Sequence, residues 1–137
     1  MSSLLDKIDH LGIAVKSVSE GYRVFPLAFG LKPHKFEEVP EQKVKVAFYK
    51  VGDSNLEFLE PTSEESPIAK FIAKRGEGIH HICFKVNDIY QALENLKNDG
   101  YRLIDEKPKI GAENKLVAFL HPKDANGVLI ELSQSQG

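Results

Sequence analysis

The amino-acid sequence contains an internal repeat in which each half begins with a histidine-bearing strand pattern and ends with a glutamate-bearing one. His10 and His81 lie 71 residues apart, and Glu57 and Glu131 lie 74 apart. The tripeptide Val-Ala-Phe at 46–48 recurs at 117–119. The repeated strands read IDHLGIAV (8–15) and NLEFLEP (55–61), then IHHICFKV (79–86) and GVLIELS (127–133). This pattern predicts two copies of one small fold, whose two histidines and two glutamates can converge on one divalent cation.

The first copy predicts a strand, a helix and then three more strands. Ser17 or Ser19 can cap a helix that runs towards Phe29, and Gly30 can end it. Strand-like runs follow near residues 32–38, 43–51 and 56–60.

The second copy repeats this order with a stronger helix signal. Asp88 is a suitable cap and Gly100 a suitable stop for an amphipathic helix. Its apolar residues fall at i, i+3, i+4 and i+7, namely Ile89, Ala92, Leu93 and Leu96. Strand-like runs follow near 102–106, 115–121 and 128–133. Each copy is therefore a βαβββ module, and the fold class is α+β.

The segment between the copies predicts a short connecting helix. Pro67 suits the first helical turn, and Lys74 and Arg75 suit the last one. We expect one domain over 1–137, with module one at about 6–62, the linker helix at about 63–77 and module two at about 78–134.

Strand alternation places the four repeated polar residues on one side of each strand. In the first strand Leu11, Ile13 and Val15 share a face, and His10 points to the opposite one. The same alternation separates His81 from the apolar Ile82, Phe84 and Val86, Glu57 from Leu56 and Phe58, and Glu131 from Val128, Ile130 and Leu132. We therefore expect the apolar face to pack under the helices and the histidine face to form an open, concave surface.

The donor types at these four positions suit a metal site. Imidazole nitrogen and carboxylate oxygen bind divalent ions such as Zn²⁺, Co²⁺, Ni²⁺ and Mn²⁺. Taken singly, a strand histidine is commonly a hydrogen-bonded surface residue and a strand glutamate a solvated one. The pairing of histidine and glutamate on matching faces in both halves favours the metal-site interpretation.

Other chemically interesting residues have simpler interpretations. Cys83 is interpreted as a small packing residue, and His80 as a structural residue on the helix-packed face. His121 and Lys123 fall in a turn built on Asp124, Asn126 and Gly127, with contact to a substrate phosphate as the less favoured alternative. His34 is given no role.

Composition narrows the class of protein. A net charge of −2, without clustered lysine and arginine, gives no electrostatic footprint for nucleic acid. Cys83 is the single cysteine, so an internal disulfide framework is excluded. No apolar run has the length of a transmembrane helix, and a charge at Asp6 interrupts any signal-peptide pattern. We expect a cytoplasmic protein that binds neither nucleic acid nor membrane.

These residues together resemble the vicinal oxygen chelate (glyoxalase/bleomycin resistance) superfamily, and within it the methylmalonyl-CoA epimerase family. The resemblance covers nearly the whole chain, and its most specific segments are GEGIHHI (76–82), FLHPKD (119–124) and GVLIEL (127–132). It implies two βαβββ modules forming a half-open, metal-centred barrel. It also implies a homodimer and a small-molecule acyl-CoA substrate.

The resemblance also implies roles for the four repeated residues. His10, His81 and Glu131 match the family's metal ligands, and Glu57 matches the remaining ligand position, where relatives have Glu or Gln. The ion would be Co²⁺, Zn²⁺, Ni²⁺ or Mn²⁺. Some epimerases carry an additional glutamate, thought to be a base, where this chain has Val46.

The implied reaction interconverts (R)- and (S)-methylmalonyl-CoA by proton abstraction and return at C2, through a metal-stabilised enolate. Glu131 is the first choice for one base and Glu57 for the other. Two alternatives remain within the superfamily. One is lactoylglutathione lyase-type isomerisation, and the other is a non-catalytic protein that sequesters a ligand.

Overall fold

The computed structural model describes residues 3–18 and 28–136 of the chain. These residues belong to two compact units, and each is described by itself. The first unit comprises His10–His80, and the second comprises Met1–Asp9 together with His81–Gly137. The helix expected to run from Ser17 or Ser19 towards Phe29 lies almost wholly outside the described residues.

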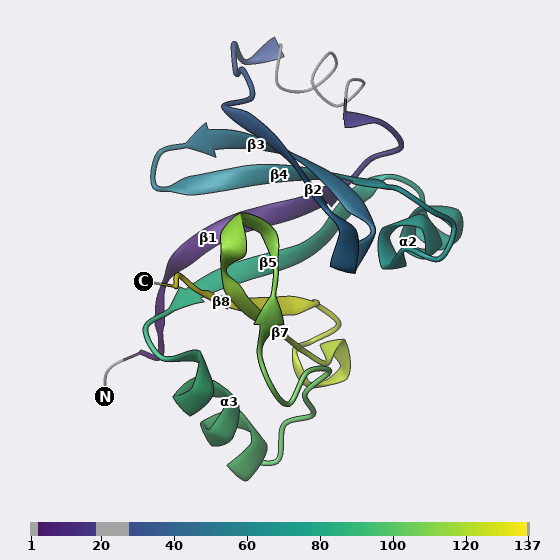
Figure 1. Cartoon of the computed structure of the whole chain (residues 1–137). Helices are drawn as coiled ribbons and strands as arrows, with labels where there is room; N and C mark the ends of the chain where they lie inside the picture. The colour runs from purple at the N-terminus through teal and green to yellow at the C-terminus, as the bar shows by residue number, and fades with distance from the viewer. Residues whose placement is uncertain (1–2, 19–27, 137) are drawn as a thin grey trace. The chain divides into compact units, whose positions relative to one another are not determined.

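The described residues of the first unit form strands β1 to β4, with β1 shared between the units, and helix α2 (Figure 1). Strand β2 (Lys35–Val39) pairs antiparallel with β3 (Val44–Val51), and β3 pairs antiparallel with β4 (Ser54–Pro61). Strand β4 then pairs parallel with the part of β1 (Leu5–Ala14) that belongs to this unit. A 3₁₀ turn, η1 (Pro40–Gln42), joins β2 to β3. The predicted strands of the first module are therefore present, although β2 begins three residues later than expected.

The connecting helix forms where the sequence predicts it. Helix α2 spans Pro67–Arg75, and the Ser66 hydroxyl accepts a hydrogen bond of 3.1 Å from the backbone N–H of Ile68. This bond satisfies one of the N–H groups that the first turn of a helix leaves unpaired. Pro67 has no N–H to satisfy at the first helical position, which suits it to this place.

The strands of the second unit pair in the same order as those of the first, and helix α3 (Ile89–Asn98) follows the first of them in the chain (Figure 1). Strand β5 (Gly78–Val86) pairs parallel with β8 (Ile130–Gln134), and β8 pairs antiparallel with β7 (Leu116–Leu120). Strand β7 pairs in turn with the short β6 (Lys109–Ile110). Two further 3₁₀ turns, η2 (Ala112–Asn114) and η3 (Pro122–Asp124), flank β7.

Helix α3 spans Ile89–Asn98 and begins at the predicted cap. The Asp88 carboxylate accepts a hydrogen bond of 3.1 Å from the backbone N–H of Gln91. The apolar stripe of the helix is buried in a cluster of six residues, Val86, Ile89, Ala92, Leu93, Ala118 and Leu132. The helix therefore packs on the apolar face of β5 and β8, as the alternation predicts.

The core of the first unit follows the same rule. Val15, Ala47, Tyr49 and Phe58 are buried together, with Ile13 and Leu56 packed against them. Ile13 and Val15 alternate away from His10, and Leu56 and Phe58 alternate away from Glu57, which confirms the predicted division of faces in this unit.

The prediction of a strand at 102–106 is wrong. Only an isolated bridge between Leu103 and Leu120 forms there, and β6 lies further along the chain. The reason is a competing side chain, because the Asp105 carboxylate accepts the hydrogen bond of the Phe119 N–H at 2.9 Å. That N–H is then not available to a ladder formed by the backbone at 102–106.

The last strand also differs slightly from the prediction. Strand β8 begins at Ile130, and Val128 lies outside it with its side chain exposed. The Val128 N–H donates to the Ala125 carbonyl in the preceding turn, so Val128 does not pair with β7. Among the described helices, none is both long and apolar enough to cross a membrane.

Candidate metal centre

The first unit brings His10 and Glu57 together. In the parallel pairing of β1 with β4, Glu57 lies directly opposite Gly12, two residues beyond His10 on the same face. Gly12 has no side chain to fill the space between them. His10 Nδ1 lies 3.0 Å from Glu57 Oε2, within the range of a charge-assisted hydrogen bond.

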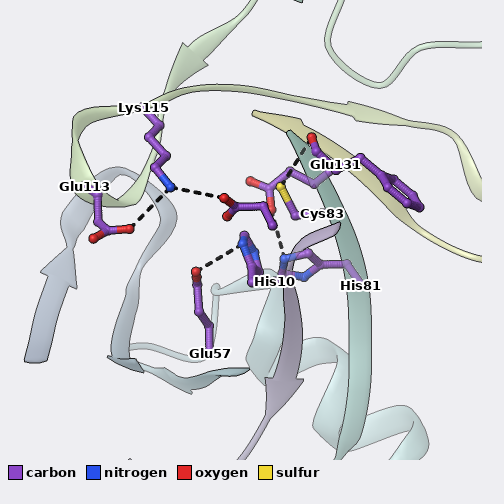
Figure 2. A network of polar contacts seen from close by, with 9 residues as sticks. His10, Glu57, His81, Cys83, Glu113, Lys115 and Glu131 are labelled. Carbon is purple, nitrogen blue, oxygen red and sulfur yellow. Dashed lines mark hydrogen bonds and ion pairs between the residues drawn. The ribbon is translucent and has the colours of Figure 1, made fainter. Parts of the chain in front are cut away.

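The second unit brings His81 and Glu131 together in a corresponding way (Figure 2). In the parallel pairing of β5 with β8, Glu131 lies opposite Cys83, two residues beyond His81. Cys83 is small and wholly buried, and it occupies the place of Gly12 in the repeat. His81 Nε2 lies 2.9 Å from Glu131 Oε1. The repeat seen in the sequence therefore extends to strand register.

These polar side chains are buried rather than open. The four residues have exposed fractions of 4 to 6%, which corrects the expectation of an open histidine face. An enclosed carboxylate is costly unless it is paired or bound to a cation. The imidazole contact in each unit meets this requirement.

The donor set of each unit fits a divalent metal. One imidazole nitrogen and one carboxylate oxygen, 2.9 to 3.0 Å apart, can both turn to a cation without a change of strand register. Nitrogen and oxygen donors of these types suit Zn²⁺, Co²⁺, Ni²⁺ and Mn²⁺, so the expected ion class is compatible with the residues present.

The chain is similar to known proteins of one superfamily. Residues 9–119 match the family model of the Glyoxalase/Bleomycin resistance protein/Dioxygenase superfamily. An ethylmalonyl-CoA/methylmalonyl-CoA epimerase of Cereibacter sphaeroides is 39% identical, over 96% of this chain and 99% of its own length. The mitochondrial methylmalonyl-CoA epimerase of Homo sapiens is also 39% identical, over 96% of this chain and 75% of its own length. The chain belongs to the methylmalonyl-CoA epimerase family.

A solved structure supports the same assignment. A variant of the Streptomyces coelicolor methylmalonyl-CoA epimerase, in complex with 2-nitronate-propionyl-CoA, superposes with a TM-score of 0.93 at 36% sequence identity. The likeness covers 97% of this chain and 96% of that one. It confirms the predicted α+β fold class with its repeated strand-rich modules, and it confirms the resemblance drawn from the sequence.

His80 and Cys83 have the structural roles that the sequence predicts for them. The His80 ring packs edge-to-face on Phe71 of α2, with 5.0 Å between the ring centroids. Cys83 is buried in β5, where its small side chain adjoins Glu131 in the neighbouring strand. The ring of His34, which had no predicted role, packs on Phe48 with 6.0 Å between the ring centroids.

The turn after β7 is a structural element. His121 caps η3, because its Nδ1 accepts a hydrogen bond of 3.1 Å from the Lys123 N–H. The Asp124 carboxylate accepts hydrogen bonds from the Arg102 backbone N–H at 2.7 Å and from its Nε and Nη2 at 3.0 Å. Side-chain hydrogen bonding to Arg102, more than the charge of the guanidinium, lowers the pKa of Asp124 to about 2. These hydrogen bonds support the interpretation of residues 121–127 as a structural turn.

Sequence reasoning missed a group of residues around Phe119. Phe119 lies directly opposite Glu131 in the pairing of β7 with β8, and its ring packs edge-to-face against His81. The repeated Val-Ala-Phe tripeptide was the available signal, but only strand register shows that its phenylalanine shares a face with the glutamate.

A second group that the sequence did not reveal surrounds Lys115 (Figure 2). Lys115 Nζ lies 3.4 Å from Asp9 Oδ1 and 3.5 Å from Glu113 Oε1. Asp9 is buried and directly precedes His10 in the chain. Lys115 thereby offsets the charge of the buried carboxylate next to a candidate ligand.

Proposed function

We propose that the chain catalyses the interconversion of (R)- and (S)-methylmalonyl-CoA by removing and returning the proton at C2. The duplicated histidine–glutamate pair, in a chain of the methylmalonyl-CoA epimerase family, carries this proposal. The C2 proton lies next to a thioester carbonyl and is only weakly acidic in water. Catalysis therefore requires stabilisation of the developing negative charge and two positioned bases.

The proposed metal ligands are His10, Glu57, His81 and Glu131. Their support is the shared strand register in both units and the short nitrogen-to-oxygen distances within each pair. A divalent ion held by these residues would supply Lewis-acid stabilisation of charge on the thioester oxygen. The identity of the ion among Co²⁺, Zn²⁺, Ni²⁺ and Mn²⁺ would depend on which metal is available to the protein as well as on the donor atoms.

The proposed bases are Glu131 and Glu57. Inversion at C2 needs one base to take the proton and a conjugate acid to return it on the opposite face. The two glutamates occupy equivalent positions in the repeat, so each is assigned to one face of the substrate. Strand β3 offers no carboxylate at Val46, which leaves Glu57 as the candidate in the first unit.

Proton exchange in D₂O tests this function. The metal-loaded protein is incubated with (S)-methylmalonyl-CoA, and deuterium at C2 and the appearance of the (R) form are followed by mass spectrometry and a stereospecific assay. Deuterium incorporation with epimerisation supports the proposal. Turnover only of the hemithioacetal of methylglyoxal and glutathione would instead assign a lyase. Tight ligand binding without exchange would assign sequestration.

The proposal includes a homodimer acting in the cytoplasm on a small acyl-CoA substrate, as the family resemblance implies. Sedimentation equilibrium of the purified protein measures the oligomeric state directly, and a monomer at micromolar concentration would refute that part.

A further inference from the structure

We propose that Phe119 is a positioning residue, which holds the His81 imidazole in the orientation that metal binding requires. Asp105 and Lys109 in turn hold Phe119 in place. This inference rests on the proposed metal site and extends it to side chains that donate no ligand atom. All the residues that carry it belong to the second unit.

The contact between Phe119 and His81 is direct. Their ring centroids lie 5.7 Å apart with an interplanar angle of 81°, the edge-to-face arrangement that aromatic rings favour. His81 also contacts Glu131, whose Oε1 lies 2.9 Å from the His81 Nε2. A histidine side chain has two rotatable torsions, and these two contacts together restrict them.

The backbone of Phe119 is fixed at both polar groups. Its N–H donates to Asp105 Oδ2 at 2.9 Å, and its carbonyl accepts from the N–H groups of Ile104 at 2.9 Å and Asp105 at 3.3 Å. Phe119 also lies in strand β7, opposite Glu131 in β8. The ring is thus attached to a backbone segment that has little freedom to shift.

A cation holds the ring itself. Lys109 Nζ lies 5.3 Å from the centroid of the Phe119 ring, within the range of a cation–π interaction. The same ammonium lies 3.3 Å from Asp105 Oδ1. Asp105 therefore binds both the backbone of Phe119 and the lysine that covers its ring.

The first unit has a related but different arrangement. Phe48 lies opposite Glu57, and Lys35 Nζ lies 5.0 Å from its ring centroid. Its aromatic contact, however, is to His34 rather than to the candidate ligand His10. The lysine–phenylalanine–glutamate order is therefore part of the repeat, and in the second unit the phenylalanine also contacts the candidate ligand His81.

The test compares Phe119→Leu with Phe119→Tyr and with a matched control, Phe84→Leu. Phe84 belongs to the same unit but packs on the opposite, apolar face of β5. Co²⁺ is titrated into metal-free protein, and its visible d–d absorption reports both affinity and coordination geometry. Thermal unfolding of the metal-free variants measures their stability.

We expect Phe119→Leu to weaken Co²⁺ binding by about 10-fold and to change the absorption spectrum, at the low end of the effect of groups that orient ligating histidines. Phe119→Tyr keeps the ring and restores wild-type binding. Phe84→Leu lowers the unfolding temperature but leaves Co²⁺ affinity within about twofold. If Phe119→Leu does not fold, Lys109→Met loosens the same ring and should weaken binding by up to about fivefold.

The outcomes separate this inference from the proposed function. Wild-type affinity and spectrum in folded Phe119→Leu, or in Lys109→Met where that variant is used, would overturn the positioning role while leaving the metal site intact. A wild-type protein that binds no Co²⁺ would overturn the proposed metal site, and the positioning role with it. Equal losses of affinity in Phe119→Leu and Phe84→Leu would reduce Phe119 to a general packing residue and so refute the inference.

Discussion

Replacing Glu57 by glutamine separates metal binding from proton transfer in the first unit. The amide has nearly the size of the carboxylate and keeps one oxygen that can bind a cation, but it cannot act as a base. Glu57 is only 4% exposed, and its Oε2 lies 3.0 Å from His10 Nδ1. Gly12 lies opposite it in β1, so a side chain of similar size meets no new obstacle there.

The size of the effect follows from the role assigned to the carboxylate. Removing a positioned general base costs on the order of 10²- to 10⁴-fold in rate, which is about 3 to 5 kcal/mol in the activation barrier. Loss of the charge-assisted contact to His10 should lower the free energy of unfolding by about 1.5 to 3 kcal/mol. In a two-base reaction each base serves one epimer. We therefore expect the C2 proton of one epimer to exchange slowly and that of the other to exchange near the wild-type rate.

The assay measures exchange for (R)- and (S)-methylmalonyl-CoA separately, in D₂O, with variants whose metal content has been measured. Glu131→Gln should show the reverse preference between the epimers. Glu60→Gln is the matched control, because Glu60 lies in the same strand on the opposite face and accepts a hydrogen bond from the Val18 N–H at 2.9 Å. It should lose some stability but exchange both epimers normally.

One result would refute the reasoning. If metal-loaded Glu57→Gln exchanges both epimers at wild-type rates, Glu57 is a ligand without a role in proton transfer, and the base in the first unit must be another group.

Three further predictions concern the second unit. Asp88→Ala removes the cap hydrogen bond to the Gln91 N–H and should lower the free energy of unfolding by about 1 kcal/mol in urea titrations; an unchanged midpoint would contradict the cap. Leu93→Ala empties part of the cluster under α3, where Leu93 is 4% exposed, and should cost about 2 to 5 kcal/mol by the same measurement, so a loss below 1 kcal/mol would argue against tight packing there. Asp124→Asn should lower the unfolding temperature at neutral pH, because Arg102 lowers the pKa of the folded Asp124 from 3.8 to about 2. That stabilisation is complete above about pH 4 and is lost as the pH falls to about 2. The unfolding temperatures of wild type and variant should therefore converge over this range. A difference in unfolding temperature that stays constant with pH would refute the role given to Asp124.

Much of the architecture could be predicted because it depends on local patterns. The cap at Asp88 and the apolar spacing that follows it define α3 within a residue or two. Alternation in the first module places Leu56 and Phe58 in the core and Glu57 on the other face. These features depend on backbone periodicity and on hydrogen bonds between near neighbours, which a sequence carries directly.

The absence of the strand expected near 102–106 could not be predicted, because it depends on a hydrogen bond between residues distant in sequence. The segment has suitable residues for a strand, but the Asp105 carboxylate takes the Phe119 N–H that a ladder would need. Burial of His10 and His81 likewise depends on what surrounds them in the folded chain rather than on alternation.

The sequence by itself determined the repeat, the faces of its strands and the identity of the candidate ligands. Tertiary structure alone decided that each glutamate lies opposite a small residue two positions beyond its histidine, which brings His10 to Glu57 and His81 to Glu131. It also decided that Phe119 packs against His81. The physical reason is that side-chain alternation is a property of one strand, whereas register and ring contacts arise only when strands distant in sequence pair.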